Sequence, residues 1–223
     1  MGTAHAGARW NAHPAVRSRS KRALDVAGAT IGLLLSSPLL LTAALAVRVR
    51  MGRPVLFRQT RPGMHARPFT ALKLRTMAAA TDRHGRAVDD AARLTRLGRW
   101  LRAWSIDELP QLWNVLRGDM SLVGPRPLLP EYIERYSPEQ ARRHEVRPGL
   151  TGWAQVHGRN EVAWEPRLAL DTWYVEHWSF GLDVKILWRS VGVLLKRTGI
   201  AAPGSATMAP FQPSSDADPS TSA

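Results

Sequence analysis

Residues 26–47 read VAGATIGLLLSSPLLLTAALAV, a stretch of 22 residues without a charged side chain. As an α-helix this stretch would be about 33 Å long, enough to cross a hydrocarbon core of about 30 Å. A long basic segment precedes the run and no A-x-A cleavage site ends a short apolar core, so the run does not fit a signal peptide. Its length is typical of a membrane helix; a buried helix of a soluble protein is the alternative.

Basic residues flank the run on both sides, which conflicts with a straight membrane span. The positive-inside rule places both flanks on the cytoplasmic side, and one straight helix cannot satisfy that. The flanking cations are Arg17, Arg19, Lys21 and Arg22 before the run and Arg48, Arg50, Arg53, Arg58 and Arg61 after it.

Ser36-Ser37-Pro38, in the middle of the run, offers a way to turn back. Pro38 lacks a backbone N–H and clashes with the preceding turn, and the serine hydroxyls can bond to the carbonyls that a break would free. Each half would reach about 16 Å, roughly one leaflet. We therefore expect a re-entrant helix–break–helix over about 23–48 that enters and leaves by the same face. A kinked span with the N-terminus outside is the alternative.

The net charge of +13 belongs almost entirely to the first third of the chain. Residues 1–80 contain 13 Lys and Arg but one acid, Asp25, whereas the rest is nearly balanced. Such a block indicates a polyanion nearby, either an anionic membrane face or nucleic acid. Nucleic acid is disfavoured because the cations flank an apolar run. The chain has no Cys, which excludes disulfide, thiol and Cys–zinc chemistry.

The remaining sequence predicts an α+β, mostly helical, single domain. Segment 54–77 has two extended stretches around the turn-rich TRPGMHARP and predicts a small β-hairpin. Helices are expected over 91–104 and 131–145, and a last helix with Asp183 as its cap. We expect residues 1–20 to be a basic flexible lead, 21–200 the folded domain and 201–223 a disordered tail.

Asp107 and Glu108 are adjacent within SIDELPQLWNVLRGDMSLVGPRPLLPEY, residues 105–132. At a helix N-terminus both carboxylates would lie near the positive end of the helix dipole. One could attack a phosphoryl group while the other binds Mg²⁺, which prefers oxygen ligands. Acids in a first helical turn are also common as caps, so the pair alone does not define a function.

Two turns rich in Gly and Pro follow the acidic pair. GPRP at 124–127 presents Arg126, and VRPGLTGWAQVHGRN at 146–160 presents Arg147 and Arg159. Guanidinium groups match phosphate oxygens, and Gly and Pro allow a backbone to approach a ligand closely. Two acids and several Arg on rigid turns predict a diphosphate or nucleotide site, although no Walker A or Rossmann glycine motif is present.

These motifs occur together with KRALD at 21–25, SSP at 36–38, FRQTRPG at 57–63 and LKLRTM at 72–77. In this order they resemble the bacterial sugar transferases, the small monotopic polyprenyl-phosphate phosphoglycosyl transferases. The resemblance covers about residues 20–200. It is strongest to the minimal members of the family, which consist of the catalytic domain only.

The resemblance implies a monotopic enzyme at the cytoplasmic face of the bacterial inner membrane. A UDP-sugar would give its phosphosugar to undecaprenyl phosphate and UMP would leave, as the first step of a lipid-linked glycan for exopolysaccharide, capsule, O-antigen or glycoprotein. Asp107 would carry the phosphosugar as a covalent ester, and Glu108 would help hold Mg²⁺.

Further residues complete the expected sites. The substrate-binding set is Lys73, Arg126, Pro127, Arg147, Arg159 and Asp171. The membrane set, where the helix enters and breaks, is Lys21, Arg22, Asp25, Ser37 and Pro38. Anionic lipid and downstream glycosyltransferases are expected partners, and nucleic acid is not. A non-catalytic membrane adaptor that binds anionic lipid is the alternative function, but it leaves the acids and Arg turns of 105–160 unexplained.

Overall fold

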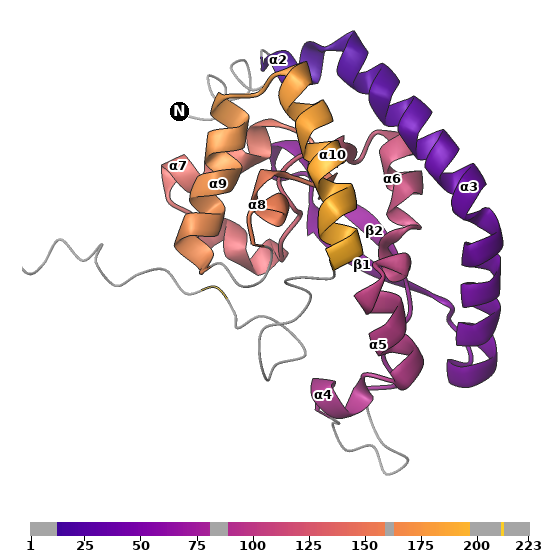
Figure 1. Cartoon of the computed structure of the whole chain (residues 1–223). Coiled ribbons are helices and arrows are strands. Elements are labelled where there is room, and N and C mark those ends of the chain that lie inside the picture. Colours follow the sequence, from indigo (N-terminus) through magenta and orange to yellow (C-terminus); the bar gives the residue numbers. More distant parts are fainter. Residues whose placement is uncertain (1–12, 81–88, 159–162, 197–210, 212–223) are drawn as a thin grey trace, which may run out of the picture.

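The structure, a computed structural model, describes residues 13–80, 89–158, 163–196 and 211. This part is α+β, as predicted, with helices around two two-stranded sheets. Figure 1 shows α3 along one side of the molecule and α7 and α9 on the far side, with the strands between them. The elements are α2 (Pro14–Arg17), α3 (Arg19–Met51), β1 (Leu56–Pro62), η1 (Met64–Ala66), β2 (Pro68–Leu74), α4 (Asp90–Arg93), α5 (Arg96–Ala103), η2 (Ile106–Glu108), α6 (Gln111–Arg117), β3 (Ser121–Val123), η3 (Pro130–Arg135), α7 (Pro138–Ala141), η4 (Arg142–Glu145), β4 (Gly149–Thr151), α8 (Trp153–Val156), α9 (Trp164–Glu176) and α10 (Phe180–Lys196).

Helix α3 contains the whole apolar run and is continuous over 33 residues. The hydroxyl of Ser18 caps its start by accepting the N–H of Lys21 at 3.1 Å. Gly52 ends it with a φ of 75°, which glycine adopts without steric cost. Pro38 lies inside the helix, so the predicted interruption is not present. The helix bends instead, and Figure 1 shows α3 changing direction near its middle.

A side-chain hydroxyl explains why the helix stays continuous at its proline. Pro38 has no N–H to donate to the carbonyl of Leu34, and the Ser37 hydroxyl donates to that carbonyl at 2.8 Å instead. Thr42 similarly donates to the carbonyl of Leu39 at 2.9 Å. The predicted role of serine hydroxyls in this run is confirmed for Ser37.

Both halves of α3 pack against the same folded body. In the first half, Gly28 lies so close to Leu122 that a Cβ at Gly28 would be 2.6 Å from it. In the second half, Ala43 and Val47 are buried in a cluster with Leu101. The helix therefore rests on the domain at both ends of its apolar run.

The outward face of α3 is apolar and exposed. Leu35 is 79% exposed and Val49 is 74% exposed. By length and composition α3 could cross a membrane, and only a small share of its apolar window is buried. An exposed apolar row of this size marks an interaction surface, so α3 is not the buried core helix of a soluble protein. The exposed apolar residues are Val26, Ile31, Leu34, Leu35, Leu39, Leu41, Leu45 and Val49.

The predicted β-hairpin is confirmed: β1 and β2 pair antiparallel over their whole length. Asn114 of α6 holds β2 in place, because its amide nitrogen donates to the carbonyl of Thr70 at 2.8 Å and its oxygen accepts the N–H of Leu72 at 3.2 Å. This contact positions the next residue of β2, Lys73, relative to α6.

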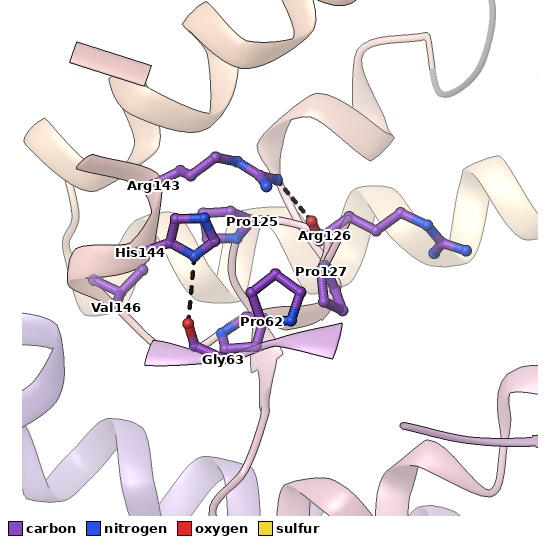
Figure 2. Close-up of a pocket in the computed structure, with 9 residues that line it drawn as sticks. Pro62, Gly63, Pro125, Arg126, Pro127, Arg143, His144 and Val146 are labelled. Carbon is purple, nitrogen blue, oxygen red and sulfur yellow. Dashed lines mark hydrogen bonds between the residues drawn. The ribbon is translucent and has the colours of Figure 1, made fainter. Parts of the chain in front are cut away.

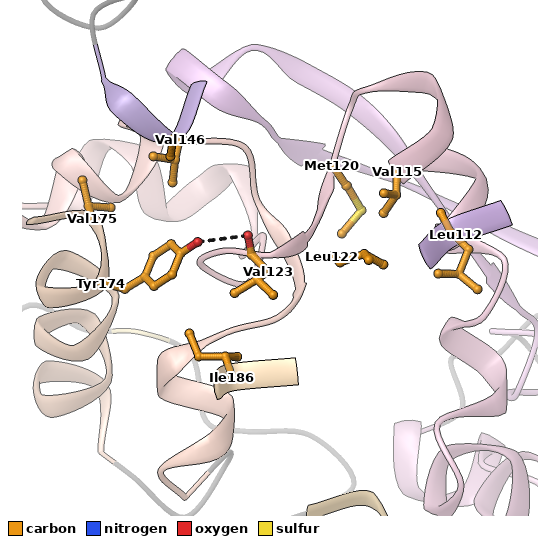
Figure 3. Packing of buried hydrophobic residues seen from close by; sticks show 11 residues of the cluster. Leu112, Val115, Met120, Leu122, Val123, Val146, Tyr174, Val175 and Ile186 are labelled. Atoms are coloured by element: carbon orange, nitrogen blue, oxygen red, sulfur yellow. Dashed lines mark hydrogen bonds between the residues drawn. The ribbon is translucent and has the colours of Figure 1, made fainter. Parts of the chain in front are cut away.

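The main core lies where α3, α6 and β3 meet α9 and α10 (Figure 3). Tyr174 of α9 is buried, and its hydroxyl lies 3.2 Å from the carbonyl of Val123 in β3. Ile186 of α10 and Val115 of α6 are completely buried on either side of β3. Strand β3 is thus surrounded by helices from both ends of the chain.

Several local predictions need correction. Segment 131–145 is not one surface helix but three short turns, η3, α7 and η4, because Pro130 and Pro138 each begin a new one. Arg143 and His144 within it are buried. Segment 91–104 is divided into α4 and α5, with Thr95 as the cap of α5.

The predictions for the ends of the chain also change. The flexible lead does not extend to residue 20, because α2 begins at Pro14 and the His13 side chain hydrogen-bonds to the carbonyl of Val175 at 2.9 Å. Helix α10 begins at Phe180, so Asp183 is not its cap; it is buried within the first turn. The predicted tail lies outside the described residues except for Phe211, which is buried.

Candidate active site

Asp107 and Glu108 lie on η2, a single turn between α5 and α6. Ser105, just before the turn, has a left-handed backbone with a φ of 54°, which is uncommon for a residue other than glycine. This conformation turns the chain sharply after α5, so that the two acids form their own turn ahead of α6. The two acids therefore precede the cap of α6 and are not in the first turn of that helix.

Glu108 is clamped by two cations from other elements. Lys73 of β2 donates to Glu108 Oε1 at 2.6 Å. Arg126 donates to both oxygens, with Nη1 lying 3.1 Å from Oε2 and Nη2 bonded to Oε1. Burial opposes the charge on Glu108, but Arg126 and Lys73 outweigh it and hold the pKa of this carboxyl well below its usual range. Glu108 is therefore ionised at neutral pH.

Asp107 is in the opposite situation. Its side chain is buried, and within the described residues it accepts no hydrogen bond and forms no ion pair. Burial and, next, the charge of Glu108 raise the pKa of Asp107 to about 6, against the opposing influence of Lys73, Arg102 and Arg126. Two adjacent carboxyls thus have pKa values pushed apart, which is typical of groups with different roles in catalysis.

The loop that carries Arg126 is held by a buried ion pair. Arg143 Nη2 donates to the backbone carbonyl of Arg126 at 2.6 Å and to Asp171 Oδ2 at 2.7 Å. Arg143 and Asp171 are both buried. Asp171, predicted to bind substrate, is placed behind the loop and supports Arg126 through Arg143; its predicted contact with substrate stays a prediction.

A shallow pocket lies behind the same loop (Figure 2). It encloses essentially no free volume, so the pocket is too small for a sugar nucleotide. His144 lines it, and burial lowers the pKa of His144 to about 4, which leaves the ring neutral. Figure 2 shows the Arg126 side chain directed away from this pocket. Pro127 also lines it, together with Pro62, Gly63, Pro125, Arg143, Val146 and Pro148.

The second predicted Arg turn is only partly described. Arg147 Nε donates to the carbonyl of Gly118 at 3.0 Å, and the charged groups that influence its pKa are Arg22 and Asp25. The structure therefore places Arg147 near the start of α3 and not in the Asp107–Glu108 cluster. Arg159 lies outside the described residues, and its role stays a prediction.

The glycines of the two turns approach each other. β3 and β4 pair in parallel, and a Cβ at Gly149 would lie 2.1 Å from the nitrogen of Gly124. Glycine at these two positions therefore allows the two backbones to contact each other. From the sequence we had expected the glycines to allow a close approach to a ligand.

Two cations near the acids were not predicted as site residues. Arg102 of α5 lies close enough to lower the pKa of Asp107, and its Nε donates to the Thr76 hydroxyl at 3.1 Å. Arg61 of β1 is influenced by both Arg126 and Glu108. The helix expected over 91–104 gave no reason to place Arg102 near the acids, and nothing in the sequence indicated the left-handed turn at Ser105.

The charged residues of the predicted membrane set are bound within the protein. Lys21 is buried, 2.7 Å from Asp183. Arg22 donates to the carbonyls of Val115 and Leu116, each at 2.7 Å. Asp25 accepts the hydroxyl of Ser121 at 2.9 Å. These residues attach α3 to the domain.

The described residues contain no group of three His, Cys, Asp or Glu that would hold a metal by itself. Mg²⁺ is usually held by one or two carboxylates together with substrate phosphates and water. Among the residues that the structure describes, Asp107 accepts no hydrogen bond and Glu108 Oε2 accepts one, from Arg126. The acidic pair therefore fits a metal that arrives with a phosphate-bearing ligand.

A buried carboxylate without a partner among the described residues, next to one bound by Lys and Arg, suits an enzyme that acts on phosphate-bearing groups. Comparison with known proteins gives the particular kind. The chain belongs to the bacterial sugar transferase family, whose sequence model matches residues 16–197. It is a sugar transferase, and the non-catalytic adaptor is no longer a competing interpretation.

Individual relatives agree with this assignment. The chain is 50% identical over 196 residues to the uncharacterized sugar transferase EpsL of Bacillus subtilis, and the match covers 88% of this chain and 97% of the relative. It is 50% identical over 187 residues to a UDP-glucose:undecaprenyl-phosphate glucose-1-phosphate transferase of Caulobacter vibrioides, and that match covers 78% of this chain and 69% of the relative. A UDP-galactose-lipid carrier transferase of Erwinia amylovora is 40% identical over 80% of this chain, which spans 41% of that relative.

Proposed function

We propose that this enzyme transfers a sugar phosphate from a UDP-sugar to undecaprenyl phosphate, through a covalent intermediate on Asp107. One observation carries the proposal: Asp107 is buried and has no partner in the described part of the chain, beside a carboxylate that two cations hold in place. The Caulobacter vibrioides relative is named for such a transfer with glucose, and the Erwinia amylovora relative for galactose and a lipid carrier.

The first step is an exchange at phosphorus. An Asp107 oxygen bonds to the sugar-linked phosphorus of the UDP-sugar while the bond from that phosphorus to the bridging oxygen breaks. The bridging oxygen and its electron pair leave with UMP, and Asp107 carries the phosphosugar as an acyl phosphate ester.

In the second step a phosphate oxygen of undecaprenyl phosphate bonds to the same phosphorus. The Asp107 oxygen leaves with its electron pair, which restores the carboxylate and forms a lipid diphosphate sugar. Because the two substrates react in turn, the soluble donor and the lipid acceptor never need to be bound together.

The surrounding cations match the charge that these steps handle. Arg126 and Lys73 already bind Glu108 and would contact the phosphate oxygens from the same positions. Glu108 keeps both cations oriented before the donor arrives. Mg²⁺, held by Glu108 with the donor phosphates, would offset phosphate charge when bound.

We further propose that α3 inserts from the cytoplasmic face and returns to it. Support comes from the docking of both halves of α3 onto one body, with the apolar middle facing outward. A helix held at both ends by one folded body cannot place its ends on opposite sides of a bilayer while that body stays in water. The product would then enter assembly of a lipid-linked glycan, with downstream glycosyltransferases as partners.

The test is to trap the intermediate. The protein in detergent is incubated with UDP-sugars labelled at the sugar-linked phosphate, without undecaprenyl phosphate, and the labelled peptide is identified by mass spectrometry. We expect the label on Asp107, no label on Asp107→Asn, and normal labelling of Glu134→Gln, an exposed carboxylate that serves as the control. A label on another residue, or UMP release by Asp107→Asn near the unmodified rate, would contradict the proposal.

A further inference from the structure

Phe211 lies beyond residue 197, where the family match ends, yet it is only 1% exposed. Its ring contacts three aromatic rings, those of Tyr132, Tyr136 and Trp164, with centroid distances of 5.7, 5.8 and 5.5 Å. Its carbonyl accepts a hydrogen bond from Arg135 Nη1 at 2.7 Å. A residue outside the family domain therefore fills an aromatic pocket within it.

The walls of this pocket belong to segments that border the active site. Tyr132 and Tyr136 follow the loop that carries Arg126, and Trp164 begins α9. The buried cluster around Phe211 also includes Leu128, two residues after Arg126. Packing here thus joins the loop after β3 to α9.

A short series of hydrogen bonds leads from the pocket to Arg126. The ring of Tyr136 packs on Phe211, and its hydroxyl accepts from Arg143 Nη1 at 3.2 Å. Arg143 Nη2 donates in turn to the backbone carbonyl of Arg126. The Arg126 side chain is the one that clamps Glu108. Two side chains, those of Tyr136 and Arg143, therefore lie between Phe211 and the residue that binds Glu108, Arg126.

We propose that Phe211 is a positioning residue for the transfer reaction. By filling the pocket it fixes Tyr136 and Arg143, and these fix the backbone of Arg126 where its guanidinium meets the donor diphosphate. This inference rests on the proposed function, since it assumes that Arg126 binds the donor. It predicts that loss of Phe211 weakens use of the UDP-sugar and not of undecaprenyl phosphate.

The test is steady-state UMP release by the full chain in detergent, with each substrate varied in turn. For Phe211→Ala we expect the KM for the UDP-sugar to rise about 10-fold, kcat to fall less than about 3-fold and the KM for undecaprenyl phosphate to stay unchanged. Phe211→Leu, which keeps most of the buried apolar volume, should stay within about 3-fold of the unmodified enzyme.

Tyr136→Phe provides a second approach that does not depend on folding of Phe211→Ala. It removes only the hydroxyl that accepts from Arg143, and we expect about a 3-fold rise in the donor KM. Tyr132→Phe is the matched control, because within the described residues the Tyr132 hydroxyl does not hydrogen-bond to Arg143. The donor KM of Tyr132→Phe should not change.

Three outcomes would overturn the inference. Reduced thermal stability with an unchanged donor KM in both Phe211→Ala and Tyr136→Phe would make Phe211 an ordinary core residue. Faster turnover of Phe211→Ala would make it an inhibitory plug. Equal donor KM values for Tyr136→Phe and Tyr132→Phe would remove the route through Arg143. If the unmodified enzyme released no UMP from any UDP-sugar, the proposed function itself would have failed, which is a separate result.

Discussion

Lys21, in the first turn of α3, lies 2.7 Å from the carboxylate of Asp183, in the first turn of α10, and both side chains are buried. The pair joins the start of the apolar helix to the last helix of the domain. At the other end of α3, Arg75 donates to the carbonyl of Met51 at 3.2 Å. Both ends of the apolar helix are thus held by polar contacts to one body, which decides how the helix can meet a membrane.

Breaking the Lys21–Asp183 pair should cost much more stability than breaking an exposed pair. Lys21→Met leaves the Asp183 charge buried without its cation, and we expect the free energy of unfolding to fall by about 3–5 kcal/mol. Arg142→Met breaks the half-exposed Arg142–Glu176 pair and should cost less than about 1 kcal/mol. Thermal denaturation in detergent compares the two. Equal losses would mean that the buried pair does not attach α3.

The rate of the first step should depend on the ionisation of Asp107. Burial and the Glu108 charge raise the pKa of Asp107 to about 6, and only the ionised carboxylate attacks phosphorus. The single-turnover rate of UMP release, measured without lipid acceptor, should therefore rise with pH to a plateau, with a midpoint near pH 6. A rate that is constant between pH 5 and pH 8 would contradict this assignment.

Replacing Glu108 should move that midpoint as well as slow the reaction. Glu108→Gln removes the negative charge that helps raise the pKa of Asp107, so the midpoint should shift below pH 6. It also removes the charged partner of Arg126 and Lys73, and we expect the plateau rate to fall about 100-fold. The pH dependence of single-turnover UMP release measures both effects. An unshifted midpoint would show that Glu108 does not influence Asp107.

Asp107→Asn should stabilise the protein at neutral pH. The pKa of Asp107 is about 6 when folded and about 3.8 when unfolded, so the folded state binds more protons between these values and loses stability as the pH rises through them. Asn carries no charge and avoids this loss. At pH 7.5 the gain should be on the order of 2–3 kcal/mol, and it should nearly disappear at pH 4. Thermal denaturation at both pH values measures the difference, and an equal effect at both would contradict it.

The topology of α3 can be tested with single cysteines, since the chain contains none of its own. Ser20→Cys places an exposed thiol in the first turn of α3, ahead of the apolar run, and Thr60→Cys places one after the helix. Leu41→Cys places a thiol on the exposed apolar face of α3. In inverted membrane vesicles a membrane-impermeant maleimide should modify the first two and not the third. In right-side-out vesicles none should react. Modification of Ser20→Cys in right-side-out vesicles would show that the N-terminus is outside and that α3 spans.

Much of the site was predictable because its residues lie next to recognisable local patterns. Asp107 and Glu108 stand out as an adjacent pair, and the turn around Arg126 as a rigid one. Lys73 was assigned through the resemblance of its strand to the family, and the hairpin brings it to Glu108. The structure brings these residues together around Glu108, and their roles in catalysis stay a prediction.

Other features could not be predicted, because they depend on contacts between distant segments. Arg102 reaches the neighbourhood of Asp107 only through the left-handed turn at Ser105, which has no sequence signal since serine seldom adopts it. Arg147 was expected beside the acids and lies near the start of α3. Phe211 lies in a segment whose composition predicts disorder, yet its side chain is buried against aromatic residues of the domain. Composition averaged over a segment does not reveal that one side chain has such a contact.

The sequence by itself determined the apolar helix, the hairpin, the acidic pair and the family, because each depends on periodicity, composition or a contiguous motif. Only the tertiary structure decided that the helix bends without breaking, that its flanking charges attach it to the domain, and which cations face the two carboxyls. Those outcomes depend on which buried charges find partners across many residues of chain, and burial and pairing are properties of the folded molecule.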